Sequence, residues 1–592
     1  MKRCHWRAGL IGFAGFILSL SGKAHAEYRV EIEAEAPVRA LLAEHLDLVR
    51  YKARNDISDE QFKFLVDTVA EQVTQLASTE GYFTPVTKVD IKQAGSSELK
   101  VVHVRVDSGK RTVVSNANVE VIGPVNEQAP ERAVQLKKRW RMTPGRPFRQ
   151  ADWDDAKDTA LNGLQQQTYA AARITQSEAR IEPDLQEAQL AVEIDSGPKF
   201  TLGALKISGT KRYPPRIIEN VNPLQAGEPY DVQRLLELQR QIQRLPYFGN
   251  VIVGIDDDPA HAEMTPVKVQ VSEVPTQRIR AGVGYASDTG AHVEGRYSHY
   301  NLFDRAWVFD SQLKIEQQRQ FGSLKLDMPP DQYGYINGGS TSYERTTLSG
   351  IDLRSFRLGV KHARNREKYD LAYGLDFYLD ELKQIENTPL PPNTVATPGK
   401  HRALVPSFAW TRRDVDDPIF PRSGNIISAQ AGFGVKGLLT DQTFVRGYAR
   451  MRQYFPVGRR DVVILRGEVG AALTGGSSAD IPASLLFRAG GNDSIRGYGY
   501  QSIGNLQNGT VFPTRFLASG SAEYQHWLTH QWGGAVFYDA GTATDNWTDK
   551  IIYHGVGVGA RWRSPVGTLN VDLAYGVQAK QIRPHISLGI AF

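Results

Sequence analysis

The sequence predicts an exported protein of two unlike parts: three α+β modules, followed by a transmembrane β-barrel of sixteen antiparallel strands. Three observations lead to this fold class. The chain of 592 residues begins with a short apolar segment of the kind that directs export. A set of strand and helix signals then recurs three times up to about residue 275. Residues 276–592 alternate between apolar and polar side chains with almost no helical period.

The composition excludes two other classes of protein. Hydrophobic residues make up 41% of the chain and charged residues 23%, which is unlike a disordered protein. No run of about 18 apolar residues follows residue 26, so a helical membrane span is excluded there. If the exported chain enters a membrane, it must therefore do so as a closed barrel.

The first 26 residues have the pattern of a secretory signal peptide. A basic start precedes the apolar stretch Ala8–Leu20, and the small residues Ala24 and Ala26 favour cleavage before Glu27. The alternative is an uncleaved anchor helix. The single cysteine, Cys4, would be lost on cleavage, which excludes a disulfide or a thiolate nucleophile in the mature chain. Loss of the basic residues also leaves almost no net charge, so charge does not indicate a nucleic-acid partner.

Repeated signals divide the next part into modules at residues 27–110, 111–198 and 199–275. Ser58 and Gln61 fit a capping box that opens a helix ending near Gly81, and Asp231 is a candidate cap for a helix that ends before Pro246. Each module is expected to run strand, helix, helix, strand, strand. The recurring pieces are the acidic strand ends at Asp107, Asp195 and Glu273, the turns Gly145–Phe148 and Gly227–Tyr230, and the segments Gly81–Phe83 and Pro246–Gly249.

Residues 276–592 predict the barrel. Apolar side chains alternate with Gly, Arg, Asp and Ser, which is typical of strands between lipid and a polar lumen. At about 20 residues per strand and connection, this length holds roughly 16 strands. A soluble sandwich also alternates, but its strands are shorter and no export signal is needed for it. The clearest apolar positions are Ile279, Ala281, Val283 and Tyr285; Val556, Val558, Ala560 and Trp562; Leu569, Val571, Leu573 and Tyr575; and Ile586, Leu588, Ile590 and Phe592.

One Gly-rich segment carries a candidate lumenal site. Arg496, Gly497 and Tyr498 follow Ala489–Ser494, and the carboxylates Glu523 and Asp539 lie on two later predicted strands. A carboxylate that points into a crowded lumen needs a partner, and a guanidinium offers it bidentate geometry. Arg496 is therefore a candidate partner for such a carboxylate. The alternative is an ordinary exposed loop.

Together these features resemble the outer-membrane assembly-factor superfamily, whose members carry periplasmic POTRA modules ahead of a 16-stranded barrel. Ser494–Tyr498 is similar to the V/I-R-G-F/Y motif of that family, which tips the sixth extracellular loop folded back into the lumen. The resemblance implies that Glu523 and the segment Phe537–Gly541, which contains Asp539 and Gly541, receive this motif. Asn301–Phe303 and Asp417–Gly424 resemble recurrent family segments near strand connections.

The resemblance also implies a branch and its partners. Three modules resemble the TamA-type branch, the outer-membrane subunit of the translocation and assembly module, whereas the main assembly factors carry five modules and two-partner secretion transporters carry two. It implies a barrel in the cell outer-membrane bilayer with periplasmic modules, unfolded autotransporter or other outer-membrane protein substrates, and an inner-membrane-anchored, periplasm-spanning TamB-like partner. Phospholipid passage is a further activity that the resemblance suggests.

Other functions are weighed against this one. A two-partner secretion pore or another POTRA-barrel transporter is the principal alternative. An outer-membrane enzyme is less favoured, because the sequence has no G-x-S-x-G or H-E-x-x-H motif and its histidines are scattered. No cofactor, metal or nucleic acid is therefore expected.

The two ends of the barrel sequence predict a lateral seam. No hairpin joins the first strand, near Arg278–Ala286, to the last, near His585–Phe592, so this strand pair can part at least cost. Small residues there weaken cross-strand contact. These are Gly282, Gly284, Ser587 and Gly589. The C-terminal barrel signal that the family resemblance implies comprises His585, Ile590 and Phe592, with Ser587 where the family pattern has Gly.

Overall fold

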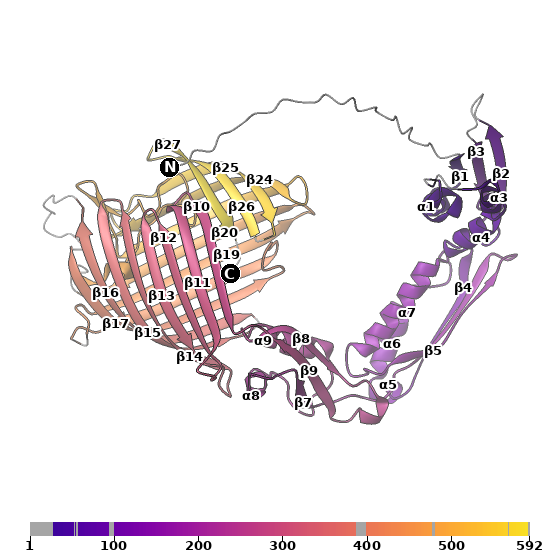
Figure 1. Cartoon of the computed structure of the whole chain (residues 1–592), viewed down its shortest axis with the longest axis horizontal. Helices are drawn as coiled ribbons and strands as arrows, with labels where there is room; N and C mark the ends of the chain where they lie inside the picture. Colours follow the sequence, from indigo (N-terminus) through magenta and orange to yellow (C-terminus); the bar gives the residue numbers. More distant parts are fainter. Residues whose placement is uncertain are drawn as a thin grey trace, which may run out of the picture. The chain divides into compact units, whose positions relative to one another are not determined.

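The computed structural model describes residues 28–589, apart from 53, 55–56, 94–99, 367, 386–397, 438, 476–479 and 566. It contains three small three-stranded sheets followed by one sheet of sixteen strands (Figure 1). The chain forms two compact units: one holds the residues up to Leu202 with 227–232 and 257–265, and the other holds the remainder. The predicted signal peptide, residues 1–26, and the terminal Ile590 and Phe592 lie outside the described residues.

The first small sheet has the order β1-β3-β2, with β1 parallel to β3 and β2 antiparallel to it. The predicted capping box is present: Gln61 N donates to Ser58 Oγ at 3.2 Å, and Ser58 N donates to Gln61 Oε1 at 3.0 Å. The single helix expected up to Gly81 is instead two helices. The Thr68 hydroxyl between them donates to Phe64 O at 3.0 Å, a bond that competes with the helical ladder. The elements are β1 (Tyr28–Glu33), α1 (Ala36–His45), α2 (Asp47–Arg50), α3 (Asp59–Asp67), α4 (Val69–Thr79), β2 (Val86–Gln93) and β3 (Lys100–Asp107).

The second and third small sheets repeat this plan, with orders β4-β6-β5 and β7-β9-β8. In each, the last strand of the segment lies in the middle of the sheet, and helices pack on the sheet. The second segment comprises β4 (Val113–Ile122), α5 (Val125–Gln128), α6 (Pro130–Arg139), α7 (Gln150–Gln165), β5 (Arg173–Glu182) and β6 (Glu187–Asp195). The third comprises β7 (Leu202–Ser208), α8 (Arg216–Glu219), α9 (Val232–Gln243), β8 (Phe248–Ile255), the 3₁₀ turn η1 (Pro259–His261) and β9 (Thr265–Glu273).

The acidic residues that recur at strand ends make local hydrogen bonds. Asp107 accepts the Gly109 N–H at 3.1 Å, and Asp195 accepts the Gly197 N–H at 3.0 Å. Both bonds close a turn directly after the middle strand of a sheet. This explains why the same short pattern recurs along the sequence.

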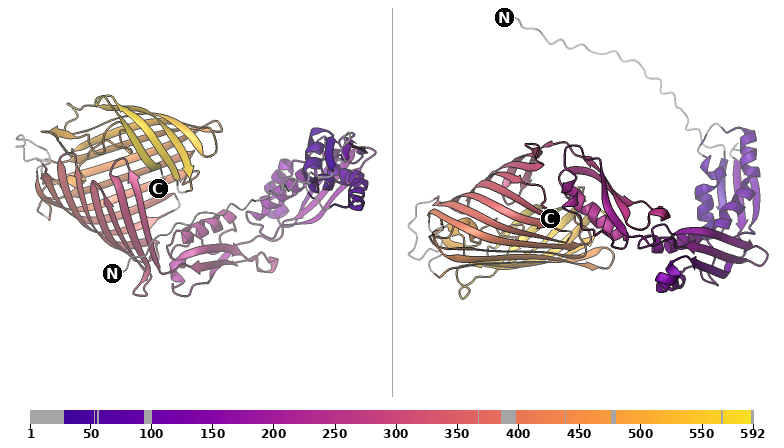
Figure 2. Two further views of the ribbon diagram at one scale, coloured as in Figure 1. Left: turned by 45° about the horizontal axis from the view of Figure 1, so that its top comes forward. Right: turned by 90° about the horizontal axis from the view of Figure 1, so that it is seen from below.

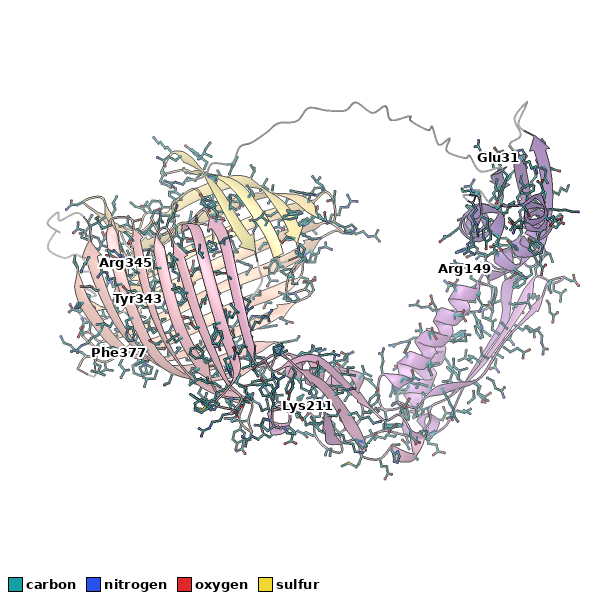
Figure 3. All side chains as sticks on the ribbon, in the orientation of Figure 1. Glu31, Arg149, Lys211, Tyr343, Arg345 and Phe377 are labelled. Carbon is teal, nitrogen blue, oxygen red and sulfur yellow. The ribbon has the colours of Figure 1, made fainter. Side chains whose placement is uncertain are left out.

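The third member of this series, Glu273, is more strongly held. Its carboxylate accepts the backbone N–H groups of Lys211 (labelled in Figure 3), Arg212 and Tyr213 at 2.6, 2.8 and 3.2 Å, and the Arg212 Nε at 2.8 Å. Partial burial by itself would raise the pKa of Glu273, but these donors outweigh it and lower that pKa to about 2.

Glu80 joins the first two segments of the chain. Its carboxylate accepts two hydrogen bonds of 2.9 and 2.8 Å from Arg149, which is labelled in Figure 3, and a third of 3.3 Å from Arg111. Paired guanidinium donors of this kind give both energy and a defined geometry. The contact therefore constrains how the first sheet meets the second.

The sixteen-stranded sheet runs in strict sequence order from β10 to β27 and is antiparallel between neighbours. Figures 1 and 2 show its long strands curving around to form a barrel wall. The strands are β10 (Gln277–Ala286), β11 (Gly290–Leu302), β12 (Trp307–Glu316), β13 (Arg319–Asp327), β14 (Tyr335–Leu348), β15 (Ile351–Asn365), β16 (Tyr369–Gln384), β17 (Gly399–Val415), β18 (Gly424–Gly434), β19 (Phe444–Val457), β20 (Asp461–Leu473), β23 (Phe516–Trp527), β24 (Trp532–Thr544), β25 (Tyr553–Ser564), β26 (Gly567–Gly576) and β27 (Gln581–Gly589).

The alternation of side chains has the expected consequence for the wall. Ile279 and Val283 of β10 are 78% and 84% exposed, and Val558 and Leu573 are also exposed on the outside of their strands. An exposed apolar band of this kind suits contact with lipid. Within the described residues, no helix is both long and apolar enough to cross a membrane.

One long connection, between β20 and β23, folds into the barrel. It carries the 3₁₀ turn η3 (Ala483–Leu485) and the short strands β21 (Asn505–Gln507) and β22 (Thr510–Phe512). Its apolar side chains share one buried cluster with side chains of the wall. The loop contributes Ile481, Leu485, Leu486, Phe487, Ile495, Tyr498, Ile503 and Phe512, and the wall contributes Ile351, Leu382, Ala403, Val405, Phe444 and Leu517.

The third segment contacts the turn between β11 and β12. The buried Tyr247 hydroxyl donates to Ala306 O at 2.7 Å, and burial raises the pKa of Tyr247. Asn301 shapes that turn, since its side chain accepts the Ala306 N–H at 2.8 Å and donates to Asp304 at 3.1 Å. Two segments singled out in the sequence, Pro246–Gly249 and Asn301–Phe303, therefore each make a hydrogen bond with Ala306, through Tyr247 and Asn301.

The Glu273 network generates a prediction about the stability of the third segment. Glu273→Gln removes the charge that four donors share, and we expect a loss of about 1.5–3 kcal/mol, the range for hydrogen bonds to a charged group. Far-ultraviolet circular dichroism during urea unfolding of the full-length protein would measure it, because every α-helix of the described residues lies before β10.

The pH dependence has a defined sign. The folded-state pKa of Glu273 is depressed, so its stabilising contribution is complete above the unfolded value of about 4.3 and is lost as the pH falls towards 2. The difference in stability between wild type and Glu273→Gln should therefore shrink over this range. A difference that stays constant down to pH 2 would contradict the assignment.

Candidate functional site

Arg496, at the tip of the lumenal loop, lies in a buried cluster of carboxylates. Its side chain is 4% exposed. Nε and Nη2 donate to the two oxygens of Asp539 at 2.8 and 2.9 Å, and Nη1 donates to Glu523 at 2.7 Å and to Asp572 at 3.1 Å. The structure thus brings together the three residues that the sequence analysis expects to pair, and it adds Asp572.

Two further contacts define the position of Arg496. Its backbone N–H donates to Asp539 Oδ2 at 3.0 Å, and the centre of its guanidinium lies 3.3 Å from the centroid of the Phe537 ring. A guanidinium over an aromatic face gains an additional attraction when both are shielded from water. The main chain and the side chain of the loop are therefore both anchored to β24.

Arg561 is a functional candidate that sequence reasoning missed. It is almost fully buried, donates to Glu523 Oε1 from Nε and Nη2 at 3.1 and 2.8 Å, and donates to Asp572 from Nη1. Its position on the polar face of an alternating strand could have indicated that the Arg561 side chain points into the lumen. Arg466 completes the group through Ser521 at 3.0 Å, so three guanidiniums face three carboxylates.

Gly497 and Tyr498 extend the anchoring to the last two strands. Gly497 has φ +91°, and a Cβ there would lie 2.6 Å from the backbone nitrogen of Gly576. This close approach lets the Gly497 N–H donate to His585 Nε2 at 2.9 Å. The Tyr498 hydroxyl accepts the Gln578 N–H at 3.1 Å and lies 2.5 Å from that residue's Oε1.

Gly541 has a different role from the loop residues. A Cβ at Gly541 would lie 2.5 Å from Ala518 O on the neighbouring strand β23. The residue therefore permits close packing of β24 on β23, next to the carboxylates of Asp539 and Glu523. The family resemblance implies that the segment containing Gly541 receives the loop motif, but the near neighbours of Gly541 itself are Ala518 and Ser519 and not Arg496.

The first and last strands of the barrel end the sheet without pairing to each other. In the described residues, β10 pairs only with β11, and β27 pairs only with β26. Gly282 and Gly284 face the side chains of Glu294 and His292 on β11. The other two predicted seam residues, Ser587 and Gly589, lie in β27 at register positions opposite Asn570 and Thr568.

Comparisons with known families bear on this architecture. Residues 301–592 match the Omp85 superfamily domain. The barrel is an Omp85 superfamily domain. Residues 200–273 match the POTRA family, described as a surface antigen variable number repeat. The Omp85 barrel therefore lies in the outer membrane, and the POTRA-bearing N-terminal part lies in the periplasm.

Similar proteins carry related names. The outer membrane protein assembly factor BamA of Neisseria meningitidis serogroup B is 22% identical over 89% of this chain and 72% of that protein. BamA of Nitratidesulfovibrio vulgaris is 24% identical over 64% of this chain, which spans about half of that protein's length, 48%. The crystal structure of Haemophilus ducreyi BamA lacking POTRA domains 1–3 aligns with a TM-score of 0.59 at 16% identity, covering 80% of this chain and 98% of that one. The likeness shows a shared fold.

The lumen of the Omp85 barrel contains a cavity of about 870 Å³ beside the arginine cluster. Arg496, Glu523 and Arg561 line it, and so do Ala286 and Ser587 from the two seam strands. The cavity therefore connects the anchored loop with the seam. Among the described residues, no group of three or more His, Cys, Asp or Glu side chains is placed to hold a metal ion.

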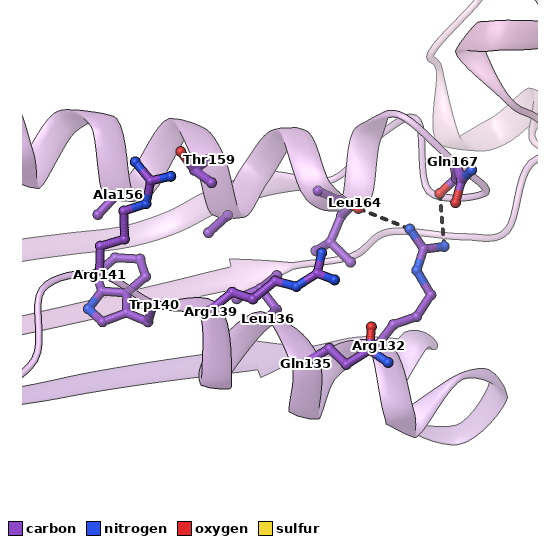
Figure 4. Close-up of a pocket in the computed structure, with 12 residues that line it drawn as sticks. Arg132, Gln135, Leu136, Arg139, Trp140, Arg141, Ala156, Thr159, Leu164 and Gln167 are labelled. Atoms are coloured by element: carbon purple, nitrogen blue, oxygen red, sulfur yellow. Dashed lines mark hydrogen bonds between the residues drawn. The ribbon is translucent and has the colours of Figure 1, made fainter. Parts of the chain in front are cut away.

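A smaller cavity of about 230 Å³ lies between α6 and α7 of the second segment (Figure 4). Arg132 spans it and donates to Gln167 O at 3.1 Å and Gly163 O at 3.0 Å. A cation at these carbonyls satisfies the C-terminal end of α7. This arginine therefore has a structural role in the helix pair.

The arginine cluster generates a prediction about the loop. Arg496→Ala should leave buried carboxylates without their partner, at a cost of about 3–5 kcal/mol, and release the segment around Gly497. Arg496→Lys should restore little, because an ammonium cannot reproduce the fork geometry. Hydrogen–deuterium exchange of peptides covering residues 489–500 would measure the release.

Arg296→Ala is the matched control. Arg296 pairs with Asp310 at 2.9 Å, but its side chain is 46% exposed, so this pair should contribute at most about 1 kcal/mol. Loop exchange should then remain at the wild-type level. Equal loop exchange in Arg496→Ala and Arg296→Ala would show that the cluster does not hold the loop.

Proposed function

We propose that this protein assembles β-barrel substrates, autotransporters among them, in the outer membrane by pairing their strand edges with the edges of β10 and β27. The observation that carries the proposal is the absence of a β10–β27 ladder in the described residues. A nascent barrel has open strand edges, and each unpaired backbone group costs several kcal/mol in lipid. A sheet that can offer its own two edges lowers that cost by β-augmentation.

The seam strands have features that support opening at this place. Small residues at 282, 284, 587 and 589 limit side-chain contact across the seam. Parting β10 from β27 therefore breaks fewer interactions than parting any strand pair joined by a continuous ladder.

We further propose that the protein is of the TamA type and acts with an inner-membrane-anchored, TamB-like partner. Three small sheets precede the barrel, which supports this branch over those with five or two modules. Each sheet has two edge strands, and an extended segment of a partner could pair with such an edge. The periplasmic position of these sheets makes them accessible to a protein that crosses the periplasm.

A two-partner secretion pore is the second candidate, because the lumen contains a cavity of about 870 Å³. A secreted chain would then pass through the lumen and leave the seam closed. The loop that carries Arg496 would have to move out of its carboxylate cluster first. The two candidates thus differ in which part of the barrel must move.

A disulfide across the seam separates them. Ala286 and Ser587 line the same cavity from opposite sides of the seam, and the only cysteine of the chain, Cys4, lies in the predicted signal peptide. We expect Ala286→Cys/Ser587→Cys to block assembly of an autotransporter substrate when oxidised and to restore it when reduced. Mass spectrometry would verify that the bond forms, which requires a Cα separation of about 4.4–6.8 Å.

The control places the same crosslink in a closed part of the wall. Ala372 of β16 and Ala409 of β17 are opposite each other in the ladder, so Ala372→Cys/Ala409→Cys should leave assembly unchanged. If the verified seam crosslink also leaves assembly unchanged, lateral opening is excluded. Continued secretion through such a crosslinked barrel would favour the pore.

A further inference from the structure

The edge of β27 that faces β10 is covered by side chains at Ile586. The Ile586 N–H donates to Ser287 Oγ at 3.1 Å, and Ile586 O accepts Asn492 Nδ2 at 2.9 Å. Ser287 directly follows β10, whereas Asn492 belongs to the lumenal loop. Both backbone groups of one edge residue are thus satisfied without a neighbouring strand.

Asn492 contacts both sides of the seam. Its Nδ2 also donates to Ser287 Oγ at 3.2 Å, and its backbone N–H donates to Asp288 Oδ2 at 3.2 Å. Its Oδ1 lies 2.6 Å from His585 Nδ1 on β27. One carboxamide therefore bridges the end of β10 and the middle of β27.

His585 links this bridge to the arginine cluster. Its Nε2 accepts the Gly497 N–H at 2.9 Å, so in the neutral ring the proton resides on Nδ1 and is donated to Asn492 Oδ1. The ring is 4% exposed and so is shielded from competing water. The positions of Arg496, Gly497 and Asn492 are consequently coupled through one imidazole.

We propose that Asn492 is a positioning residue that closes the seam: its Nδ2 takes the place of the backbone N–H that a neighbouring strand would donate to Ile586 O, beside Ser287 Oγ, which takes the place of that strand's carbonyl. Together, Asn492 Nδ2 and Ser287 Oγ offer Ile586 the donor and the acceptor that a peptide unit would offer, so an incoming substrate strand could replace them with little change in hydrogen-bond energy. The loop then holds the seam shut as long as the arginine cluster holds the loop. This inference rests on the proposed opening of the seam and identifies what regulates it.

The first test measures the β27 edge directly. Asn492→Asp keeps the acceptor for His585 but removes the donor to Ile586, and Asn492→Ala removes both. We expect peptides covering residues 581–592 to exchange hydrogen about fivefold faster in both variants, the ratio that corresponds to loss of a bond worth roughly 1 kcal/mol. Peptides around Arg496 should keep wild-type exchange in Asn492→Asp, which a general loss of structure would not allow.

Asn505→Ala is the matched control. Asn505 lies in the same loop and donates to Asp545 Oδ2 at 2.8 Å, away from the seam. Its loss should leave exchange of residues 581–592 unchanged. Ser287→Ala removes the contact on the β10 side of the same bridge. Its effect on hydrogen exchange of residues 581–592 should be less than additive with that of Asn492→Asp, because the two residues share one network.

The second test uses the seam cysteines. In Ala286→Cys/Ser587→Cys, adding Asn492→Asp should slow disulfide formation at least about threefold, because the seam spends more time open. Unchanged exchange at residues 581–592 in Asn492→Asp, Asn492→Ala and Ser287→Ala would overturn the inference, even if the seam disulfide blocks assembly. The opposite result would separate the two proposals. If residues 581–592 exchange hydrogen faster in these variants but the oxidised seam variant still assembles its substrate, the proposed function is rejected and the role of Asn492 at Ile586 is retained.

Discussion

The backbone groups of a sheet inside a membrane must find partners within the protein, and this constraint is hardest to meet where the sheet ends. Within the sixteen-stranded sheet, each strand from β11 to β26 has a paired neighbour on both sides, whereas β10 and β27 have one each in the described residues. At Ile586 the side chains of Ser287 and Asn492 supply the missing partners. Side chains can be displaced without unfolding a strand. The edge of β27 is therefore covered at Ile586 and is still available to pair with a substrate strand.

The arginine cluster determines where those side chains lie. Burial of three guanidiniums and three carboxylates adds little stability by itself, since desolvation opposes the attraction between the charges. Its effect is to specify one position for the loop, because any displacement of Arg496 leaves Asp539 or Glu523 unpaired. The apolar side chains of the loop fill the lumen but do not impose such a register. The ion pairs thus specify the position of the loop, and the packing of its apolar side chains buries it against the wall.

The periplasmic part is joined to the same region of the barrel. Only three residues separate the end of β9 from the start of β10, and Tyr247 donates to the turn that follows β11. Glu273, the last residue of β9, is itself held by Lys211, Arg212 and Tyr213. The third sheet is therefore attached firmly to the first strands of the barrel, on one side of the seam.

The sequence by itself determined the architecture, and through its family resemblance it also indicated two of the carboxylates that pair with Arg496. Alternation with period two, helical spacing and turn residues are local properties, so they predict the three α+β segments and the barrel. Residue chemistry indicates that a lumenal carboxylate needs a partner such as an arginine, and the family resemblance pointed to Glu523 and Asp539 as the carboxylates that receive Arg496. Only the tertiary structure decided that Arg561 and Asp572 share the cluster, that Thr68 divides the first long helix, and that Asn492 covers Ile586. The bridge at Ile586 joins residues almost 300 positions apart, Ser287 and Ile586, and no local pattern encodes which loop side chain reaches an edge that the closing of the barrel creates.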